Sequence, residues 1–453
     1  MILFFLLGLV RPALAFTSDY DQLAQGRLAL QETNLRGAIS NFDAAIALNA
    51  SQSEAWFLKG IAHSYLEEHT NALAAFLRAA KLQPKLAPYW MFLGMTQSRL
   101  SNYAKAVDSF KKSLEIYPFN KQAWNAKGAA NLALNRVEES FYDFDYSLRI
   151  DSNFPATWYF LGNACEARSN FQGALDCYER YLSLTNDASG FAKKGFVHYS
   201  MSNDTLSVSK LTIALSMETD IRRKVGLYNG LGAAFGRMRQ YGPGLGALSN
   251  ALRLDPEDAL TLDQMATTFH FLDQNETALA LLGKALAIHP KNDRLWDRKA
   301  SIELQIDAFT NALASVEKAL AINPKDPRHL SLKGSILSRL GRYGEAFSCL
   351  NRARALDPHD DEIPESMALA YSRMGNQNLA LKILDEILKK DRNDTSSNYN
   401  IACVYSLLGK RDKMFFYLRR SVELNPSYKR YAQKDPDFKA WWDHPIFQKI
   451  VAP

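Results

Sequence analysis

The sequence repeats every 34 residues, and this period restricts the fold of the chain more than any other feature. One unit shows its landmarks, which are Trp90, Gly94, Ala106, Phe110 and Pro118. Residues of the same kinds return 34 positions earlier and 34 positions later. A fixed period of this length is typical of stacked repeats, in which each unit packs only on its neighbours. A chain of 453 residues can therefore form one repetitive architecture rather than several globular domains.

Each unit has the pattern of two helices. Trp90, Leu93 and Gly94 lie three to four residues apart, as residues on one face of a helix do. After a polar break, Ala106 and Phe110 follow the same spacing. The proline that closes most units ends the second helix, because it cannot donate the next backbone hydrogen bond. We therefore predict an antiparallel helix pair in each unit, with small residues where the two backbones approach.

This pattern resembles the tetratricopeptide repeat, a helix–turn–helix with the arrangement W-x2-L-G-x2-Y, A-x3-F and P. The resemblance covers about nine-tenths of the chain, although Gln97 stands where the family favours tyrosine. It implies an all-α fold, a right-handed α-α superhelical solenoid of stacked helix–turn–helix units. The family serves many unrelated roles, so the resemblance indicates the fold and says little about function.

The 34-residue frame gives about twelve units and divides the chain into segments. Repeats one to six occupy residues 19–221, a basic insertion occupies 222–224, and repeats seven to twelve occupy 225–428. Repeat seven is crowded with glycine, and each glycine inside a helix costs up to ~1 kcal/mol relative to alanine. We therefore predict that the insertion and the repeats beside it form a hinge between two stiffer arms.

The last residues, 429–453, leave the frame and contain two motifs that combine aspartate, proline and phenylalanine. Such an ending resembles the tail that follows the last repeat in some prokaryotic members of the family. Its large apolar side chains could cover the exposed face of the last helix pair; they are Phe438, Trp441, Trp442 and Phe447. We predict a C-terminal cap, and a binding platform made by the two tryptophans is the alternative.

The first residues, 1–15, differ in kind from the rest. An unbroken apolar run at 2–10 is followed by Ala13, Leu14 and Ala15, which is typical of a secretory signal. The run is too short for a membrane span, which needs roughly 20 residues. We predict export to the cell envelope or beyond, with cleavage after Ala15. Because no basic residue precedes the run, a cytoplasmic protein with an apolar first helix is the alternative.

Composition and motifs argue against several classes of function. The net charge of +6 is small for this length, whereas nucleic-acid binding calls for clustered basic residues. No pair of the four cysteines has CxxC spacing, so no metal site and no cofactor is predicted. No catalytic signature is recognisable, and we do not expect an enzyme. Cys165 and Cys177 are expected on facing helices, where export would allow a disulfide, although buried free thiols are commoner.

Function is expected on the concave groove of the solenoid. In the family this groove is lined by the first helix of each unit, chiefly by its second, fifth, ninth, twelfth and thirteenth residues. These positions, here called groove positions, carry apolar and basic residues in repeats one to three and amide or aromatic residues in repeats four and five. The resulting partner-binding set is Leu23, Arg27, Phe57, Ile61, Tyr65, Met91, Met95, Arg99, Asn125, Tyr159 and Asn163.

An apolar surface of this kind indicates a contact site, and burial between neighbouring helices is the alternative. Arg339 and Arg373 occupy the thirteenth position of repeats ten and eleven. We predict a non-enzymatic scaffold that binds a partner protein or an extended peptide in its groove, without nucleic acid and without a membrane span after signal removal. A cell-envelope assembly factor and an accessory repeat protein linked to glycosyl transfer are the alternatives. The sequence does not predict the oligomeric state.

Overall fold

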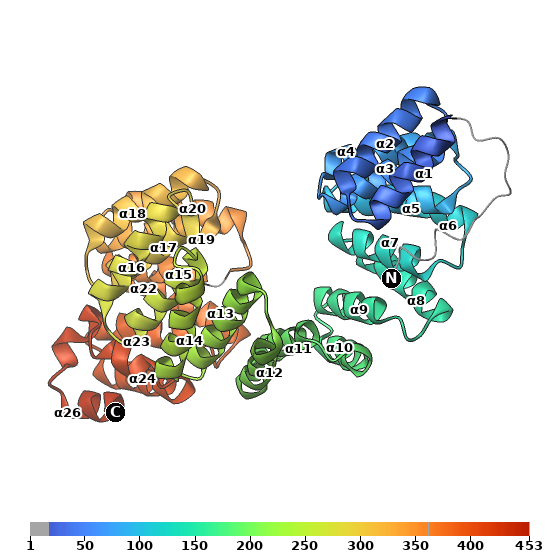
Figure 1. The fold of residues 1–453 in the computed structure, drawn as a ribbon. Coiled ribbons are helices and arrows are strands. Elements are labelled where there is room, and N and C mark those ends of the chain that lie inside the picture. The colour runs from blue at the N-terminus through green and yellow to red at the C-terminus, as the bar shows by residue number, and fades with distance from the viewer. Residues whose placement is uncertain (1–17, 361, 453) are drawn as a thin grey trace. The chain divides into compact units, whose positions relative to one another are not determined.

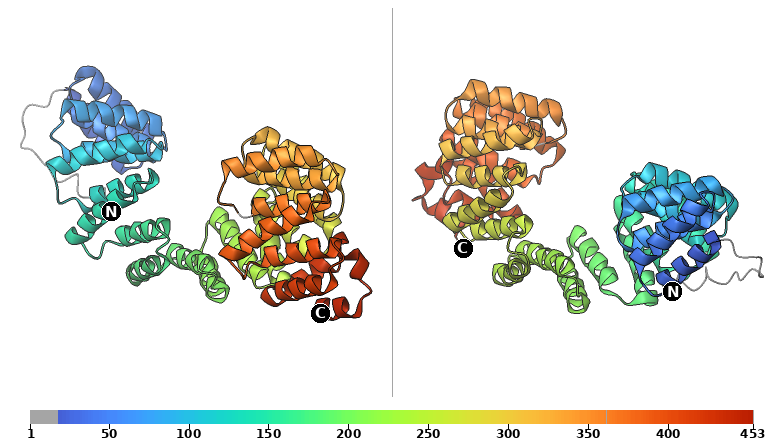
Figure 2. Two further views of the ribbon diagram at one scale, coloured as in Figure 1. Left: turned by 180° about the vertical axis from the view of Figure 1, so that it is seen from behind. Right: turned by 45° about the horizontal axis from the view of Figure 1, so that its top comes forward.

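The computed structural model describes residues 18–360 and 362–452, and over these residues the protein is built from paired helices (Figure 1). The predicted signal segment 1–15 lies outside the described residues. From α1 to α24, odd-numbered helices are the first helix of each repeat and even-numbered helices the second. Within each compact unit, successive pairs lie side by side (Figure 2). The predicted all-α solenoid of helix–turn–helix units is confirmed.

The chain divides into two compact units, the N-terminal unit Met1–Ala234 and the C-terminal unit Phe235–Pro453. The N-terminal unit contains α1 (Ser18–Gln31), α2 (Leu35–Leu48), α3 (Ser53–Tyr65), α4 (His69–Leu82), α5 (Ala87–Arg99), α6 (Tyr103–Ile116), α7 (Lys121–Ala133), α8 (Val137–Ile150), α9 (Pro155–Ala167), α10 (Phe171–Thr185), α11 (Ala188–Ser200) and α12 (Asp204–Met217). The division falls within α13 (Ile221–Arg237).

The C-terminal unit contains α14 (Tyr241–Leu254), α15 (Ala259–Phe271), α16 (Asn275–Ile288), α17 (Asp293–Gln305), α18 (Phe309–Ile322), α19 (Pro327–Arg339), α20 (Tyr343–Leu356), α21 (Glu362–Arg373), α22 (Gln377–Lys390), α23 (Thr395–Leu407) and α24 (Arg411–Leu424). The tail follows as α25 (Tyr428–Ala432), the 3-10 helix η2 (Pro436–Trp441) and α26 (Pro445–Val451). Residues 222–224 belong to the first turn of α13, so the basic segment is helical. The hinge stays a prediction.

The two helices of a repeat approach most closely at a glycine or alanine in the first helix. A Cβ atom on Gly94 would lie 2.8 Å from Cε1 of Phe110, closer than real Cβ contacts allow. The same glycine–aromatic contact occurs in repeats one, two, four and five, as Gly26–Phe42, Gly60–Phe76, Gly128–Phe144 and Gly162–Tyr178. In the C-terminal unit an aliphatic residue often replaces the ring. Repeat eight then has alanine, as Ala266 with Leu282, whereas repeat ten keeps Gly334 against Leu350. The pair sets the separation of the helices.

The turn inside each repeat has one recurring backbone design. The residue two places before the second helix has a positive φ, which is 59° at Ser101, 66° at Asp273 and 74° at Gly341. The next N–H then reaches back into the first helix, as from Asn102 to the carbonyl oxygen of Gln97 at 2.8 Å. This bond satisfies a carbonyl that the end of the helix would otherwise leave open.

A tryptophan near the start of the first helix fixes the turn that joins successive repeats. Nε1 of Trp90 donates to the carbonyl oxygen of Pro84 at 2.9 Å, and Nε1 of Trp124 donates to that of Pro118 at 2.7 Å. Equivalent bonds are made by Trp56, Trp158 and Trp296. The repeated tryptophan therefore packs between helices and also holds the backbone of the preceding turn.

The helix-separating pair leads to a stability test. We expect Gly94→Ala to destabilise the protein by about 1–2 kcal/mol, because the new methyl group overpacks the contact with Phe110. Adding Phe110→Leu creates the alanine–aliphatic pair of the C-terminal unit and should recover most of the loss. Urea unfolding followed by circular dichroism measures both effects.

Gly283→Ala is the matched control, because Gly283 also lies within a helix but a Cβ atom there would meet no atom within 4 Å. This change should stabilise the helix by up to ~1 kcal/mol. A destabilised Gly94→Ala variant that Phe110→Leu fails to rescue would contradict the packing explanation.

Candidate functional site

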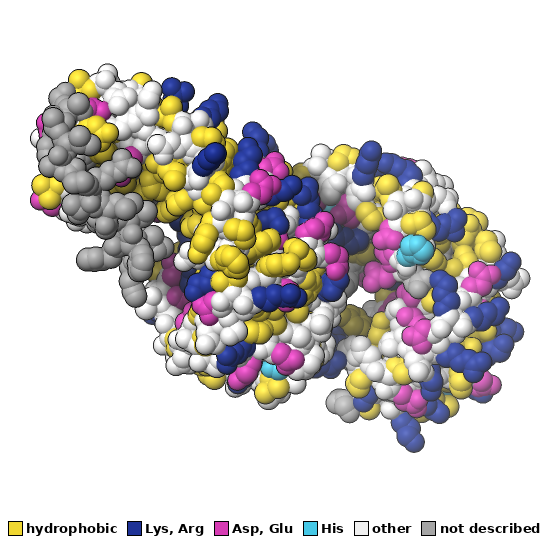
Figure 3. All heavy atoms as spheres, turned by 90° about the vertical axis from the view of Figure 1, so that its right-hand side faces the viewer, with side chains coloured by type: hydrophobic (Ala, Val, Ile, Leu, Met, Phe, Trp, Pro, Cys, Tyr) yellow, Lys and Arg dark blue, Asp and Glu magenta, His cyan; other side chains and the backbone are white. Residues whose placement is uncertain are grey.

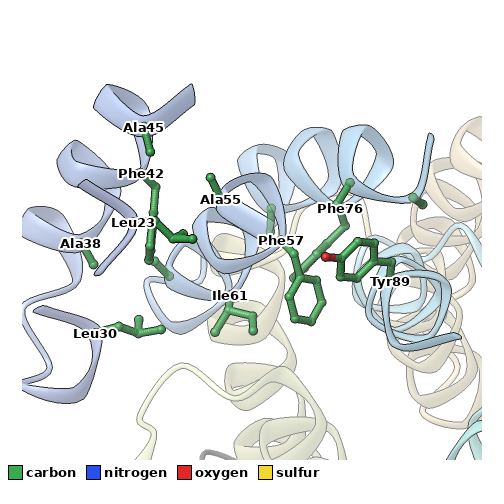
Figure 4. Packing of buried hydrophobic residues seen from close by; sticks show 14 of the residues in the cluster. Leu23, Leu30, Ala38, Phe42, Ala45, Ala55, Phe57, Ile61, Phe76 and Tyr89 are labelled. Atoms are coloured by element: carbon green, nitrogen blue, oxygen red, sulfur yellow. The ribbon is translucent and has the colours of Figure 1, made fainter. Parts of the chain in front are cut away.

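Three residues of the predicted partner-binding set lie inside the helix stack. Leu23 and Phe57 are each 3% exposed and Ile61 is 8% exposed, within the cluster drawn in Figure 4. The ring of Phe57 stacks on that of Tyr89 with centroids 4.6 Å apart and contacts Phe76 at 5.6 Å. These side chains therefore contribute to packing between repeats one to three, and an open surface there must come from other residues.

Other members of the set remain accessible on repeats two and three. Tyr65 is 56% exposed and Met95 is 36% exposed, and Arg99 is also exposed. Met91 is half-buried, and its sulfur accepts a hydrogen bond from Nδ2 of Asn120 at 3.2 Å. On the face shown in Figure 3, exposed hydrophobic side chains lie among lysines and arginines. Met95 and Arg99 lie four residues apart on α5, so repeat three offers an apolar side chain beside a positive charge.

Arg27, the basic residue of repeat one, is half-buried and forms an ion pair with Glu54 of the next repeat. Its charge is therefore partly neutralised within the stack. This placement makes Arg27 a contact between repeats one and two, whereas Arg99 is exposed to solvent.

The members in repeats four and five are more enclosed. Asn125 is 7% exposed, and its Oδ1 atom has no hydrogen-bond partner among the described residues. Asn163 accepts a hydrogen bond from the hydroxyl of Tyr178 at 2.7 Å. Tyr159 is half-buried beside Tyr178, and burial raises its pKa above the ordinary value. Asn163 and Tyr159 thus make contacts inside repeat five, whereas Asn125 is buried in repeat four with its amide oxygen unbonded.

In the C-terminal unit, a buried histidine joins repeats nine and ten. Nδ1 of His329 lies 2.7 Å from a carboxylate oxygen of Asp297, and Nε2 lies 3.2 Å from Asp293 and 3.9 Å from Asp326. Burial opposes the charged imidazole, but the bonds to Asp297 and Asp293 outweigh it and raise the pKa of His329. The spacing of Asp293, Asp326 and His329 would suit a metal ion, yet their polar atoms already bond to one another and to their neighbours. We interpret the group as a contact between repeats.

Glu365 forms a second buried polar contact, between repeats eleven and twelve. Its carboxylate accepts hydrogen bonds from the hydroxyls of Ser396 and Ser397, both at 2.8 Å, and from Nδ2 of Asn400 at 2.9 Å. Burial raises the pKa of Glu365 to about 7, although the serine hydrogen bonds act in the opposite direction. Both polar contacts place acid–base groups at or beside groove positions.

The C-terminal tail occupies groove positions of repeats ten to twelve. Asp437 lies 3.2 Å from Nη2 of Arg373, and both Asp435 and Asp437 lie 3.9 Å from Arg339. The hydroxyl of Tyr399 donates to Asp435 at 3.0 Å. The predicted arginines at the thirteenth positions are therefore neutralised by carboxylates of the same chain.

Apolar packing anchors this tail to repeat twelve. Phe438 and Phe447 are fully buried, and Trp441 and Trp442 are half-buried in the cluster that includes Met414 of α24. The four side chains identified from the sequence thus pack against the last helix pair.

Cys165 and Cys177 are buried free thiols on α9 and α10, the two facing helices of repeat five. They occupy the positions where repeat three pairs Gln97 with Ser109, whose hydroxyl donates to Oε1 of Gln97 at 2.7 Å. The close approach of the thiols therefore follows from the register of the repeat.

The tetratricopeptide repeat family matches residues 23–87 and 93–155, and further single repeats of this kind match 157–190 and 395–428. A family described as the N-terminal TPR repeats region of Psidin matches residues 303–408. Together with the paired helices, these matches show that the chain belongs to the tetratricopeptide repeat family.

The chain is also similar, at low sequence identity, to several solved structures. The Cut9–Hcn1 hetero-tetramer of the APC/C matches with 12% identity over 96% of both chains and a TM-score of 0.46. A tetratricopeptide repeat protein from Parabacteroides merdae has 14% identity over 58% of this chain and 97% of its own, with a TM-score of 0.47. YrrB, described as having an unusual peptide-binding site, has 19% identity over 41% and 94%, with a TM-score of 0.34. No curated protein matches the sequence.

Among the described residues, none of the helices combines the length and the apolar character needed to cross a bilayer. Tetratricopeptide repeat proteins are generally non-enzymatic scaffolds that bind proteins or peptides. The fold therefore supports a binding role in general terms.

The two polar contacts of the C-terminal unit predict how its stability depends on pH. The folded state keeps a proton on Glu365 that the unfolded chain releases above its ordinary pKa of 4.5, so stability falls as pH rises from 4.5 to about 7. The raised pKa of His329 contributes stability that is present below its ordinary value of 6.5 and is lost at higher pH.

Urea midpoints measured from pH 5 to pH 8 (roughly the range in which these groups titrate) should therefore decrease. Glu365→Gln should reduce the fall of the urea midpoint at the acidic end of this pH range, and His329→Gln should reduce it at the basic end. Midpoints that rise across the range, or profiles that neither variant changes, would contradict the assignment.

Proposed function

We propose that the protein is a non-enzymatic scaffold that binds a partner protein, or an extended segment of one, on the exposed groove positions of repeats two and three. The observation that carries this proposal is the accessibility of Tyr65, Met95 and Arg99 at these positions. Large apolar side chains that remain exposed beside a charge are typical of a contact surface. A fitting partner would place apolar side chains on Tyr65 and Met95 and a carboxylate near Arg99.

The contrast with the C-terminal unit supports this location. There the arginines at groove positions already hold the carboxylates of Asp435 and Asp437. Tyr399 and Cys403, at the fifth and ninth positions of repeat twelve, are 7% and 1% exposed. The thirteenth positions of repeats two and three, Tyr65 and Arg99, are therefore accessible, whereas the arginines at this position in repeats ten and eleven are paired within the chain.

Alanine substitution tests the surface directly. The triple variant Tyr65→Ala, Met95→Ala and Arg99→Ala should lose the partners that the natural protein retains in affinity capture from a native envelope preparation. Loss of such central contacts commonly reduces the binding free energy by about 2 kcal/mol or more, which is roughly a thirtyfold weaker affinity. Because all three side chains are exposed, the fold should be unaffected.

The control variant is Tyr142→Ala with Phe416→Ala, since these side chains are 56% and 64% exposed but come from second helices, at α8 and α24. It should capture the same partners as the natural protein. Equal loss in both variants would indicate nonspecific apolar adhesion, and retention in the triple variant would refute the proposed surface.

We further propose that the protein acts outside the cytoplasm, in the cell envelope or beyond, on the basis of the signal-like residues 1–15. Expressed in its own host with its full sequence, the mature chain should begin at Phe16 when its N-terminus is determined by mass spectrometry. It should also appear in the envelope or extracellular fraction. An intact N-terminus on a cytoplasmic chain would reject the export proposal without affecting the binding proposal.

A further inference from the structure

The chain segment 425–434 makes contacts within the C-terminal unit that bridge large distances in sequence. Lys434 pairs with Asp273, and Arg430 donates a hydrogen bond to the carbonyl oxygen of Phe271. Nη2 of Arg430 also lies 3.5 Å from a carboxylate oxygen of Asp273. These contacts connect the tail after repeat twelve to the turn between the two helices of repeat eight.

A fourth contact extends the connection to repeat seven. Nη2 of Arg239 lies 3.4 Å from Oδ1 of Asn425, and these residues are 186 positions apart. Arg239 occupies the positive-φ position of its turn, as Asp273 does in the next repeat. The segment thus contacts the turn between the two helices in both repeat seven and repeat eight. These four contacts are here called the seam.

The two ends of the tail are held to the repeats by contacts of different strength. Beyond residue 434 the tail is held by the fully buried Phe438 and Phe447 and by the ion pair between Asp437 and Arg373, whose side chains are only 9% and 15% exposed. At the seam, the side chains of Asp273, Arg430 and Lys434 are 46%, 47% and 57% exposed. Exposed ion pairs contribute little to stability and are screened by salt, whereas buried aromatic side chains are not.

We propose that residues 425–434 form a latch that closes the C-terminal unit on itself, and that this latch opens while the tail beyond residue 434 stays on repeat twelve. Opening separates the turn of repeat eight from the tail. It thereby frees the turns of repeats seven and eight from segment 425–434, while Asp435 and Asp437 stay paired with the arginines of repeats ten and eleven. The Lys434 bond lowers the pKa of Asp273, so protonation of this carboxylate would weaken the latch only in acid. The inference does not depend on the proposed partner surface of repeats two and three.

Distance measurement by double electron–electron resonance tests the latch in the full chain. Spin labels would be attached at Glu276→Cys and Lys439→Cys, both exposed positions, in a Cys349→Ser background. At low salt we expect one narrow distance distribution. At about 1 M NaCl, where the Debye length is about 3 Å, the distribution should broaden and move to longer distances.

Charge variants identify the cause of the opening. Asp273→Lys should produce the long distances even at low salt, and adding Lys434→Asp should restore the short one in part. Asp307→Lys is the matched control, because Asp307 is the equivalent positive-φ turn residue of repeat nine, with φ 58° against 66° at Asp273. It should leave the distribution unchanged.

Hydrogen exchange of residues 436–451 separates latch opening from loss of the whole tail, and its protection should stay constant in every variant. Loss of that protection together with the distance change would overturn the proposal, because the tail would then detach as one piece. A distribution that neither salt nor Asp273→Lys alters would overturn it as well.

Discussion

The architecture depends on one contact, the approach of the two helices of a repeat at a small residue. Gly94 against Phe110 represents the form found in repeats one to five, and Ala266 with Leu282 the form common in the C-terminal unit. Either pair fills the same space, because a larger ring requires the loss of a methyl group on the opposite helix. This contact fixes the spacing within each pair and so determines which side chains of the first helix can face outward.

The helix spacing is fixed within each repeat. The residues between the recurring small and aromatic positions can therefore differ between the two units. The N-terminal unit exposes Tyr65, Met95 and Arg99, whereas the C-terminal unit engages Arg339 and Arg373 with carboxylates of its own tail. The same groove positions therefore carry an accessible surface in one unit and an intramolecular contact in the other. Because each repeat packs mainly on its neighbours, the two units can differ without disturbing the fold.

The sequence predicted the helix pairs and their family, because the 34-residue period repeats the same local contacts. It left open whether Leu23 and Phe57 are exposed or buried, since the positional rule cannot tell whether the next repeat covers a groove residue, and the structure shows both buried. The carboxylates around His329 were also missed, because they converge from α17 and from the start of α19. The tail pairs with Arg373 across 64 residues of sequence, and the pattern within one repeat does not predict a contact over this distance.

The central claim is that Tyr65 and Met95 of repeats two and three are open, while Tyr399 and Cys403 of repeat twelve are buried beneath the tail. Hydroxyl-radical footprinting of the full-length protein at neutral pH measures this side chain by side chain. Tyr65 and Met95 should be oxidised rapidly, and Tyr399 and Phe438 should be protected until the protein unfolds. Oxidation of Tyr399 and Phe438 at a rate close to that of Tyr65 would contradict the account.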